Sequence, residues 1–510
     1  MSASQAHQLW IIEALGLKLA ASASHADSSR ASTHALPNAS LTLGQRLYVA
    51  LRESIQDGAL APGSQLPASR RLAAALGIGR NTVLGAVDRL VAEGFLQAQP
   101  GSGVFVAEWQ SPPPLPPCRE VEAPPPLSAR GTRILDFERT LSGRHSAFAP
   151  GVPALDRFPR ERWQRLLRRH QQRAPTAWFD YQSQGGVSAL REALCDYLRL
   201  SRSVRCHPGQ ILITQGAQQG FELVARLLAD VGDTLWMEEP GYGGAQSCFV
   251  SAGLALEPVP VDAEGMNVAA LAPDTPAPRL IYVTPSHQYP CGVTLPLARR
   301  MALLALARRH RAWIIEDDYD SEFRYASAPI ASLQGLIEEA PVIYVGTFSK
   351  VLYPGLRLGY LVLPEALVEP FRRANARLHR EGQYLVQAAL ADFIHEGHFA
   401  RHVAQMRECY RQRQAALREA LAPAVARGLM LSAGQAGMHL VARLDTLAEE
   451  RTLVEQAAAA DILLSPLSQY YLRPPVEAGL VLGYAGATPG EIARAGGWLA
   501  QRWLALRGEA

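Results

Sequence analysis

The stretch TFSKVLYPGLRLG, residues 347–359, brings a lysine, two hydroxyls and an arginine into one Gly/Pro-broken turn. Lys350 follows an apolar run. A partly desolvated lysine whose pKa is depressed can form a Schiff base with an aldehyde. Thr347, Ser349 and Arg357 could bind a phosphate through two hydroxyls and one bidentate guanidinium. The stretch therefore predicts an anchor for an aldehyde cofactor that carries a phosphate.

Three other stretches carry groups that pyridoxal phosphate would need. Asp317, in IIEDDYD, follows an apolar run, and an acid there could keep the ring nitrogen protonated. Tyr242, in EEPGY, follows another apolar run and could stack on the ring. The turn QGAQQG, residues 215–220, begins a helix whose first N–H groups would form a phosphate cradle.

Each of these pieces also has an ordinary structural explanation. A lysine after a strand is usually a solvated surface residue, and two acids after a strand are as often a metal or capping site. The Gly turn can simply be the start of a helix. Because the four pieces follow four separate strands, we favour the cofactor site and predict pyridoxal 5'-phosphate binding.

The elements that must position these residues form an alternating pattern. The apolar runs QILITQG, DTLWMEEPGY, RLIYVTPSHQ, AWIIEDDYDSEF, VIYVGTFSK and LGYLVLP are typical of strands buried on both faces. Segments such as PLARRMALLALARRHR between them have helical spacing. The pattern predicts an α/β domain with a mainly parallel sheet, in which ligands bind beyond the carboxyl ends of the strands. From about residue 365 a helical pattern that ends in short strands predicts a smaller α+β subdomain.

A small module, residues 41–107, has a different pattern. One face of its first helix carries Leu43, Leu47, Leu51 and Ile55. A second helix, with Ser69 as its N-cap, is predicted over LPASRRLAAALG. A third helix is predicted over GRNTVLGAVDRLVAEG, and a Gly-tipped hairpin over FLQAQPGSGVFVA. This order is the plan of a winged helix-turn-helix, whose third helix enters the major groove of DNA.

Arg80, Asn81 and Thr82 lie at the start of the third helix, where base edges would be met. Arginine can bind guanine O6 and N7, and asparagine can bind adenine. Arg70, at the start of the second helix, could reach a phosphate or a base. An ordinary three-helix bundle is the alternative, but it leaves the hairpin and the position of Arg80 unexplained. We therefore predict that the module binds double-stranded DNA.

Bulk properties limit the remaining function classes. A chain of 510 residues is expected to hold roughly two or three domains, and a net charge of +3 predicts only a local nucleic-acid site. Six cysteines without a CxxC pair argue against a zinc site or a disulfide framework and fit a reducing cytoplasm. No signal peptide is expected, because the apolar stretch near the N-terminus has no basic lead-in. No membrane span is expected, because no apolar run approaches about 20 residues.

Two segments are predicted to lie outside the folded modules. Residues 108–133 include eight prolines in sixteen residues, SPPPLPPCREVEAPPP, and are expected to form an extended linker. They would separate the small module from a large one at 134–510. Residues 1–40 are rich in Ala and Ser and are expected to be a loosely ordered extension that could hold a short helix.

The small module resembles the DNA-binding domain of GntR-type bacterial regulators. The resemblance rests on GSQLPASRRLAAALGIGRNTVLGAVDRLVAEGFL and GSGVFV, which cover nearly the whole domain. It implies that Arg70, Arg80, Thr82 and the wing glycine Gly101 lie at the DNA. Gly79 stands where the family usually has Ser or Thr, so one helix-capping phosphate contact is not expected.

Residues from about 134 to 505 resemble fold-type I aminotransferases. The resemblance implies that Lys350 forms the Schiff base with pyridoxal phosphate, that Asp317 holds the ring nitrogen and that Tyr319 lies near the 3-hydroxyl. Tyr242 would stack on the ring, and Tyr181, in FDYQSQGG, would reach the cofactor of a neighbouring subunit. The implied phosphate cup consists of Ala217, Gln218, Thr347, Ser349 and Arg357. With the winged helix in front, and with TPSHQYPCG and EDDYDSEFRY, the chain resembles MocR-type regulators of the GntR family, in which GntR heads are fused to aminotransferase-like sensor domains.

Two departures from the aminotransferase pattern bear on activity. Aminotransferases commonly carry NPxG, whose Asn contacts the 3-hydroxyl, and Tyr289 stands in its place in YPCG. Their C-terminal arginine for the substrate α-carboxylate has no counterpart in EAGLVLGYAG, and Arg473 is the nearest candidate. Efficient transamination of ordinary amino acids is therefore not expected. His287, in PSHQ, could line the pocket, although a structural histidine explains it equally well.

Three functions remain. The favoured one is a cytoplasmic, homodimeric DNA-binding regulator whose large domain senses a small-molecule effector, namely an amine, an amino acid or a B6 vitamer. The second is a catalytically active aminotransferase with a DNA-binding head, which predicts multiple turnovers. The third is a repressor whose large domain is only a dimerisation scaffold, which predicts no chromophore. The absent carboxylate arginine argues against the active aminotransferase, so a turnover enzyme is not expected. The predicted cofactor residues around Lys350 argue against a large domain that serves only as a scaffold.

Overall fold

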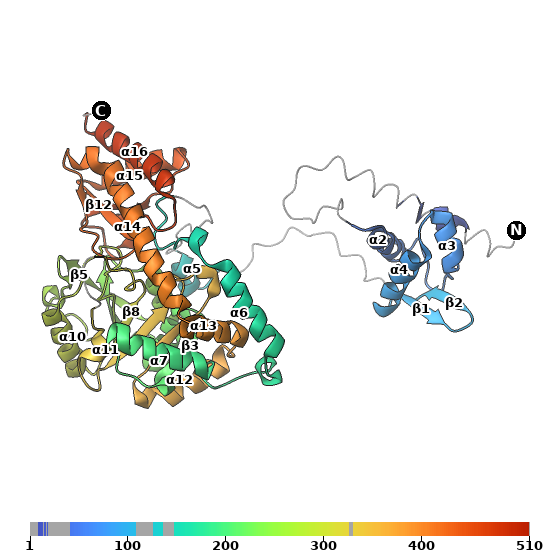
Figure 1. The fold of residues 1–510 in the computed structure, drawn as a ribbon, viewed down its shortest axis with the longest axis horizontal. Coiled ribbons are helices and arrows are strands. Elements are labelled where there is room, and N and C mark those ends of the chain that lie inside the picture. The colour runs from blue at the N-terminus through green and yellow to red at the C-terminus, as the bar shows by residue number, and fades with distance from the viewer. Residues whose placement is uncertain are drawn as a thin grey trace. The chain divides into compact units, whose positions relative to one another are not determined.

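The structure is a computed structural model with two compact units, residues 1–125 and 126–510 (Figure 1). It describes residues 9–13, 15–16, 18, 41–108, 126–135, 147–325 and 330–508. Most of the predicted extension 1–40 and linker 108–133 lies outside these residues. None of the described helices is long and apolar enough to cross a membrane.

The first unit has the predicted winged helix-turn-helix fold. Its elements are α2 (Leu43–Gln56), α3 (Ser69–Leu76), α4 (Arg80–Ala92), β1 (Leu96–Gln99) and β2 (Gly103–Val106). The strands β1 and β2 form an antiparallel hairpin, the wing, with Gly101 at its tip in the left-handed region at φ 79°. The prediction that Ser69 caps α3 was wrong, since Ala68 is the N-cap and no side chain caps this helix.

The head also includes a helical segment that precedes the predicted module. The described residues between 9 and 18 are helical, and Ile11 and Leu15 are fully buried in the same core as α2, α3 and α4. Lys18 forms an ion pair with Asp57 at 2.7 Å, and this bond lowers the pKa of Asp57. Part of the extension therefore belongs to the folded head.

The second unit is built on an eight-stranded sheet with the order β3-β10-β9-β8-β7-β4-β5-β6. The strands are β3 (Ile211–Thr214), β4 (Thr234–Glu239), β5 (Ala255–Asp262), β6 (Gly265–Met266), β7 (Leu280–Val283), β8 (Trp313–Asp318), β9 (Val342–Thr347) and β10 (Gly359–Val362). β10 and the short β6 are antiparallel to their neighbours, and the remaining pairs are parallel. The predicted mainly parallel sheet is confirmed.

Helices cover both faces of this sheet. Alternate residues of β7 point to opposite sides: Leu280 and Tyr282 pack with α8 (Ala217–Leu228) and α9 (Gly243–Ala252). Ile281 and Val283 pack with α10 (Leu297–His310). The strands are buried on both sides, which explains their continuous apolar runs.

A smaller subdomain forms the C-terminal part of this unit. It contains the antiparallel sheet β11-β12-β14-β13 with strands β11 (Met430–Leu431), β12 (His439–Leu444), β13 (Ser465–Pro466) and β14 (Ala478–Gly483). Its helices are α14 (His398–Val425), α15 (Leu447–Ala459) and α16 (Pro489–Leu506), and α14 extends down to the large sheet domain (Figure 1). The predicted α+β subdomain is present.

The second unit begins earlier than the predicted boundary at residue 134. Residues Ala129–Leu135 form helix α5, which packs against α9. The C-terminal end of the segment predicted to be an extended linker is therefore a folded part of the large unit.

Candidate functional site

The carboxyl ends of the strands and the C-terminal subdomain enclose one large cavity of about 1660 Å³. The loops after β3, β4, β7, β8 and β9 all contribute to its wall. Ten of the predicted cofactor residues line it: Ala217, Gln218, Tyr242, Tyr289, Asp317, Tyr319, Thr347, Ser349, Lys350 and Arg357. The structure thus brings together side chains that are up to 140 positions apart in the sequence (Ala217 to Arg357, 357 − 217).

Tyr181 is the one predicted cofactor residue that does not line this cavity. Its side chain is 74% exposed, and the Arg380 guanidinium lies 5.0 Å from its ring centre. Its predicted contact with the cofactor of a neighbouring subunit stays a prediction.

Lys350 lies three residues after the end of β9 and points to the part of the cavity wall formed by the segment around Gly151. Its Nζ donates a hydrogen bond to the Gly151 carbonyl at 3.0 Å. Gly151 has a φ of 70°, and a Cβ there would lie 2.7 Å from the lysine Nζ, so only glycine allows this approach. Burial lowers the pKa of Lys350, while the nearby Asp320 and Asp317 oppose this shift. A lysine with a lowered pKa is a better nucleophile at neutral pH.

Asp317, near the end of β8, is buried and only partly hydrogen-bonded. Tyr282 donates to its Oδ2 at 2.6 Å, whereas its Oδ1 has no partner among the described residues. Burial raises the pKa of Asp317 to about 7, and the Asp318 charge adds to the shift. A buried carboxylate oxygen without a donor can accept a hydrogen bond from a positively charged N–H, such as a protonated ring nitrogen.

This raised pKa leads to a prediction for the ligand-free protein. The folded protein binds the Asp317 proton more tightly than the unfolded chain does. The free energy of unfolding therefore falls as the pH rises from about 4 to about 7 and the buried carboxyl group ionises. Asp317→Asn cannot ionise. We expect it to raise the free energy of unfolding by about 1–4 kcal/mol near pH 8, and by less toward pH 4. Denaturant unfolding at both pH values measures the difference, and equal stabilities near pH 8 would contradict the assignment.

The start of α8 forms an anion-binding corner with the turn after β9. Gly216 is the N-cap of α8 and offers no side chain to the free N–H groups of Ala217 and Gln218. The Arg357 guanidinium donates to the Gln215 carbonyl at 3.1 Å, which holds it beside this helix start. The N-terminal end of a helix next to an arginine is suited to a phosphate.

Three tyrosines form an aromatic wall of the cavity. The Tyr289 ring lies edge-on to Tyr242 and to Tyr319, with centroids 5.7 and 5.8 Å apart. The hydroxyls of Tyr289 and Tyr470 are 3.0 Å apart. Tyr242 at the N-cap of α9 and Tyr289 after β7 are therefore held in fixed orientations by their neighbours.

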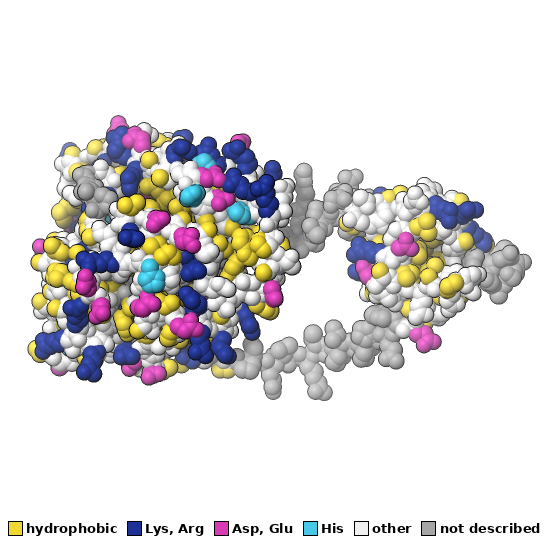
Figure 2. Space-filling view, turned by 60° about the horizontal axis from the view of Figure 1, so that its bottom comes forward, with side chains coloured by type: hydrophobic (Ala, Val, Ile, Leu, Met, Phe, Trp, Pro, Cys, Tyr) yellow, Lys and Arg dark blue, Asp and Glu magenta, His cyan; other side chains and the backbone are white. Residues whose placement is uncertain are grey.

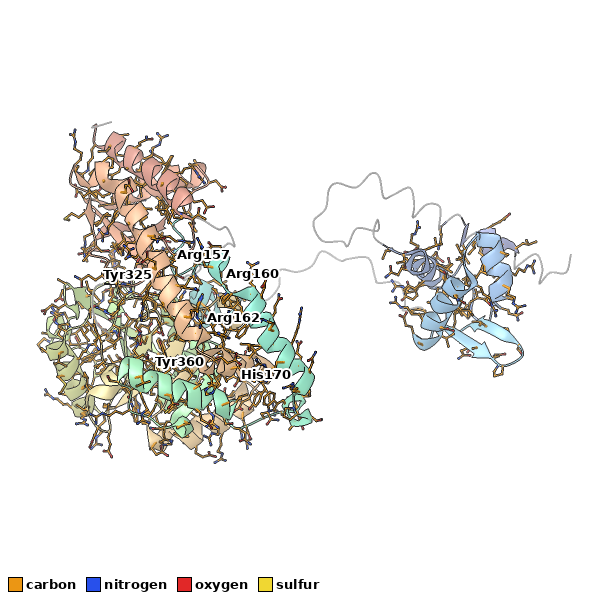
Figure 3. All side chains as sticks on the ribbon, viewed as in Figure 1. Arg157, Arg160, Arg162, His170, Tyr325 and Tyr360 are labelled. Atoms are coloured by element: carbon orange, nitrogen blue, oxygen red, sulfur yellow. The ribbon has the colours of Figure 1, made fainter. Side chains whose placement is uncertain are left out.

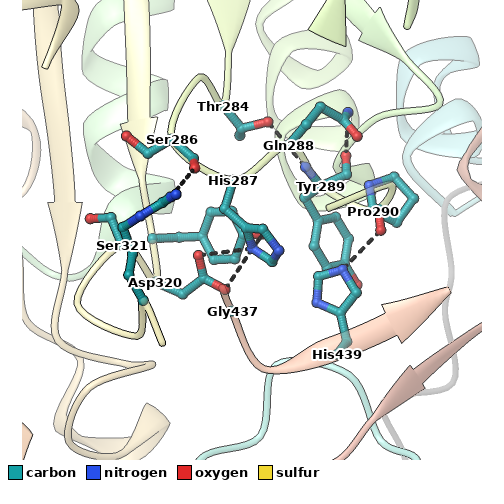
Figure 4. Close-up of polar contacts among 12 residues, drawn as sticks. Thr284, Ser286, His287, Gln288, Tyr289, Pro290, Asp320, Ser321, Gly437 and His439 are labelled. Carbon is teal, nitrogen blue, oxygen red and sulfur yellow. Dashed lines mark hydrogen bonds and ion pairs between the residues drawn. The ribbon is translucent and has the colours of Figure 1, made fainter. Parts of the chain in front are cut away.

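A polar cluster lies beside these tyrosines (Figure 4). His287 Nδ1 lies 3.0 and 3.1 Å from the two Asp320 oxygens and 2.9 Å from the Tyr319 hydroxyl. A buried carboxylate needs a donor, so we assign the proton to Nδ1. The Tyr319 oxygen then shares this N–H as an acceptor, and its own proton is available to a group in the cavity. His287 thus orients a predicted cofactor residue.

His439, on β12, was not identified from the sequence. It is buried, lines the cavity and donates from Nε2 to the Pro290 carbonyl at 2.8 Å (Figure 4). β12 comes this close because Gly437 has no side chain: a Cβ there would lie 1.9 Å from His287 Cε1. The only sequence signal was a glycine shortly before a histidine, which is too weak to predict a site.

Arg473 does not supply the absent carboxylate arginine. It pairs with Glu257 at 2.6 Å and is not part of the cavity wall. All six residues of β14, Ala478–Gly483, are buried and none is charged. The cavity does contain two further arginines, Arg160 at the start of α6 (Arg160–Arg173, Figure 3) and Arg494 on α16, both with exposed side chains.

Four of the predicted DNA-binding residues lie at the N-terminal ends of α3 and α4. Arg80 and Asn81 are exposed in the first turn of α4, Thr82 is half-buried beside them, and Arg70 is exposed at the second position of α3. Among the described residues, neither Arg70 nor Arg80 has a hydrogen-bond or ion-pair partner. Gly79 is the N-cap of α4 and makes no side-chain cap. Figure 2 shows groups of Lys and Arg side chains on the visible face of the head, with acids nearby, and both signs mixed on the larger unit.

Comparison with known proteins gives matches for both units. The family described as bacterial regulatory proteins, gntR family, matches residues 43–106, and aminotransferase class I and II matches residues 154–495. The probable rhizopine catabolism regulatory protein MocR of Rhizobium meliloti is 40% identical over 475 residues, which cover 92% of this chain and 95% of that protein. The HTH-type pyridoxine biosynthesis transcriptional regulator PdxR of Corynebacterium glutamicum is 30% identical, covering 88% and 93%.

A solved structure matches the larger unit. It is LysN, an α-aminoadipate aminotransferase from Thermus thermophilus complexed with N-(5'-phosphopyridoxyl)-L-leucine. The TM-score is 0.67 with 28% sequence identity, and the match covers 74% of this chain and 98% of LysN. The regulators match along nearly the whole chain, whereas this aminotransferase matches only part of it.

Proposed function

The chain belongs to the MocR-type transcriptional regulators of the GntR family, and on this basis we propose that its large unit binds pyridoxal 5'-phosphate to sense a small molecule. The effector would be an amine, an amino acid or a B6 vitamer. The head binds DNA, and we propose that effector binding changes its affinity for an operator. The observation that carries this proposal is the cavity lined by ten cofactor-type residues.

The residues of the cavity fit this cofactor. The unpartnered Oδ1 of Asp317 suits the ring nitrogen, and Lys350, which lines the cavity, would hold the aldehyde through its Nζ. Tyr242 would stack on the ring, while Tyr289 and Tyr319 would lie at its 3-hydroxyl. The phosphate would be held by the start of α8 and the neighbouring hydroxyls and arginine: Ala217, Gln218, Thr347, Ser349 and Arg357. When bound, pyridoxal phosphate supplies an aldehyde that reacts reversibly with amines.

The chain's own groups would carry the sensing step. Lys350 would hold the aldehyde, and because burial lowers the pKa of Lys350, its amine could accept the proton that an incoming amine gives up. Asp317 would keep a negative charge at the ring nitrogen, and Tyr319, oriented by His287, would donate to the 3-hydroxyl. Signalling requires that the head bind DNA differently in the two ligand states.

We propose that the regulator acts as a homodimer in the cytoplasm. Winged-helix heads usually pair on two half-sites, and the 74% exposed Tyr181 supports a second subunit beside the cavity. A regulator of transcription works where the chromosome is.

An active aminotransferase with a DNA-binding head is the alternative function. The LysN match supports it, and the uncharged strand β14 argues against it. We expect the purified protein to be yellow. When it is incubated with an amino acid and a keto acid, each subunit should form fewer than one molecule of product on average. Product formation over many turnovers would instead favour the alternative.

A further inference from the structure

Two hydrogen-bond acceptors line the cavity, one on β12 of the C-terminal subdomain and one in the loop after β8. His439 uses its Nε2–H for the Pro290 carbonyl, so its Nδ1 carries a lone pair and no proton. Burial, aided by His287, lowers the pKa of His439 to about 3, which keeps the ring neutral. No described residue donates to this Nδ1, although the side chain is only 3% exposed and lines the cavity. A free lone pair on a buried ring that lines a cavity indicates a ligand that donates.

Asp320 provides the second acceptor. Both of its oxygens are paired only with His287 Nδ1 among the described residues, and the side chain is 1% exposed. A carboxylate can accept about four hydrogen bonds, so the Asp320 oxygens can accept further hydrogen bonds from a ligand. Asp320 also lines the cavity.

The spacing of these acceptors fits donor groups of a ligand. One ring nitrogen of His287, one ring nitrogen of His439 and one Asp320 oxygen all lie within 4.8 Å of one another, so the His439 ring and the Asp320 carboxylate are neighbours. A donor atom can lie about 2.7–3.2 Å from each acceptor, so a small ammonium group between the two side chains can donate to both. Two neighbouring hydroxyls can also bind, one to each acceptor. A carboxylate at this place would meet a lone pair and a negative charge, and both repel it.

We propose that the effector is an amine that carries hydroxyl groups or a second amino group in place of an α-carboxylate, and that His439 and Asp320 bind these donors. The inference rests on the proposed sensing function and names the chemical class of its ligand. This chemical class agrees with the uncharged strand β14, because aminotransferases place their carboxylate-binding arginine in the matching stretch. Apart from Lys350 and the phosphate arginine Arg357, the cavity lining has two further cations that could bind a carboxylate, the exposed Arg160 and Arg494.

A matched pair of amines tests the class. 2-Amino-1,3-propanediol and L-serine differ only in that a hydroxymethyl group replaces the carboxylate. Each is titrated into the full-length, cofactor-loaded protein while the visible absorption is followed. We expect the diol to bind at least about tenfold more tightly. His439→Phe keeps a flat aromatic ring but removes both ring nitrogens, and should weaken diol binding about 10- to 100-fold with little change for serine.

Two further variants serve as controls. His439→Gln retains a hydrogen-bonding group and should recover part of the affinity for the diol. His402→Phe removes another buried histidine, which bonds the Val351 carbonyl at 3.0 Å but does not line the cavity. It should leave the preference for the diol unchanged.

The outcomes separate the inference from the proposed function. A colourless protein would overturn the proposed function. A yellow protein that prefers serine, that ignores the diol, or that keeps its preference in His439→Phe would overturn the inference alone. Serine binding that is lost in Arg160→Ala or Arg494→Ala would identify a carboxylate site instead. Stoichiometric zinc in the purified protein, lost on His439→Phe, would replace the effector subsite by a metal site.

Discussion

Replacing Lys350 with alanine is expected to give a colourless protein that no longer responds to amines. Lys350 is the only lysine at the cavity, and the chain has just one other, Lys18, in the head. Without the Nζ group no residue can hold the aldehyde covalently, so pyridoxal phosphate should be lost on gel filtration. The measurement is the visible absorption of the filtered protein, together with its operator affinity with and without amines.

The second lysine makes the control direct. Lys18→Ala breaks only the surface ion pair with Asp57 and should keep the full visible band. Borohydride reduction of the wild-type protein should attach the cofactor to the peptide that contains Lys350 and not to the one that contains Lys18. A visible band that persists in Lys350→Ala would contradict the assignment.

Replacing Arg80 with alanine is expected to have the largest effect on DNA binding. Arg80 is exposed at the first position of α4, where a recognition helix meets base edges. Loss of a bidentate contact to guanine should cost about 1–3 kcal/mol, which is roughly 5- to 150-fold in operator affinity. Arg80→Lys retains the charge but not the planar fork, so it should lose specificity while keeping most of the affinity for random-sequence DNA.

A second arginine on the same helix provides the comparison. Arg89 is in the last turn of α4, paired with Glu93 at 2.9 Å, and lies over the Tyr48 ring. Alanine at this position should leave the ratio of operator to random-sequence affinity unchanged. Fluorescence anisotropy on both duplexes measures the ratio, and an unchanged ratio in Arg80→Ala would show that α4 does not read the bases through this residue.

The cofactor-type residues could be predicted because they follow strands. In a parallel sheet the carboxyl ends of the strands meet at one edge, so Tyr242, Asp317 and Lys350 had to lie near one another once their strands were identified. The structure gives them one cavity. The turn residues of the head were predictable for a similar local reason, since helix starts and the Gly-tipped hairpin have short-range signals.

The parts that could not be predicted depend on long-range packing. His439 reaches the cavity only because β12 of the subdomain packs against the loop after β7, and no local pattern encodes that approach. Gly151 contacts Lys350 across 199 positions of sequence. Ile11 and Leu15 looked like part of an Ala/Ser-rich extension because two apolar residues do not reveal which core they complete.

The central claim is that one chain couples an amine-responsive cofactor site to DNA binding. The most direct test measures operator affinity of one cofactor-loaded sample while the visible spectrum is recorded during a titration with 2-amino-1,3-propanediol. We predict that affinity and spectrum change with the same midpoint, and that neither changes in Lys350→Ala. A spectral change without any change in operator affinity would contradict the claim.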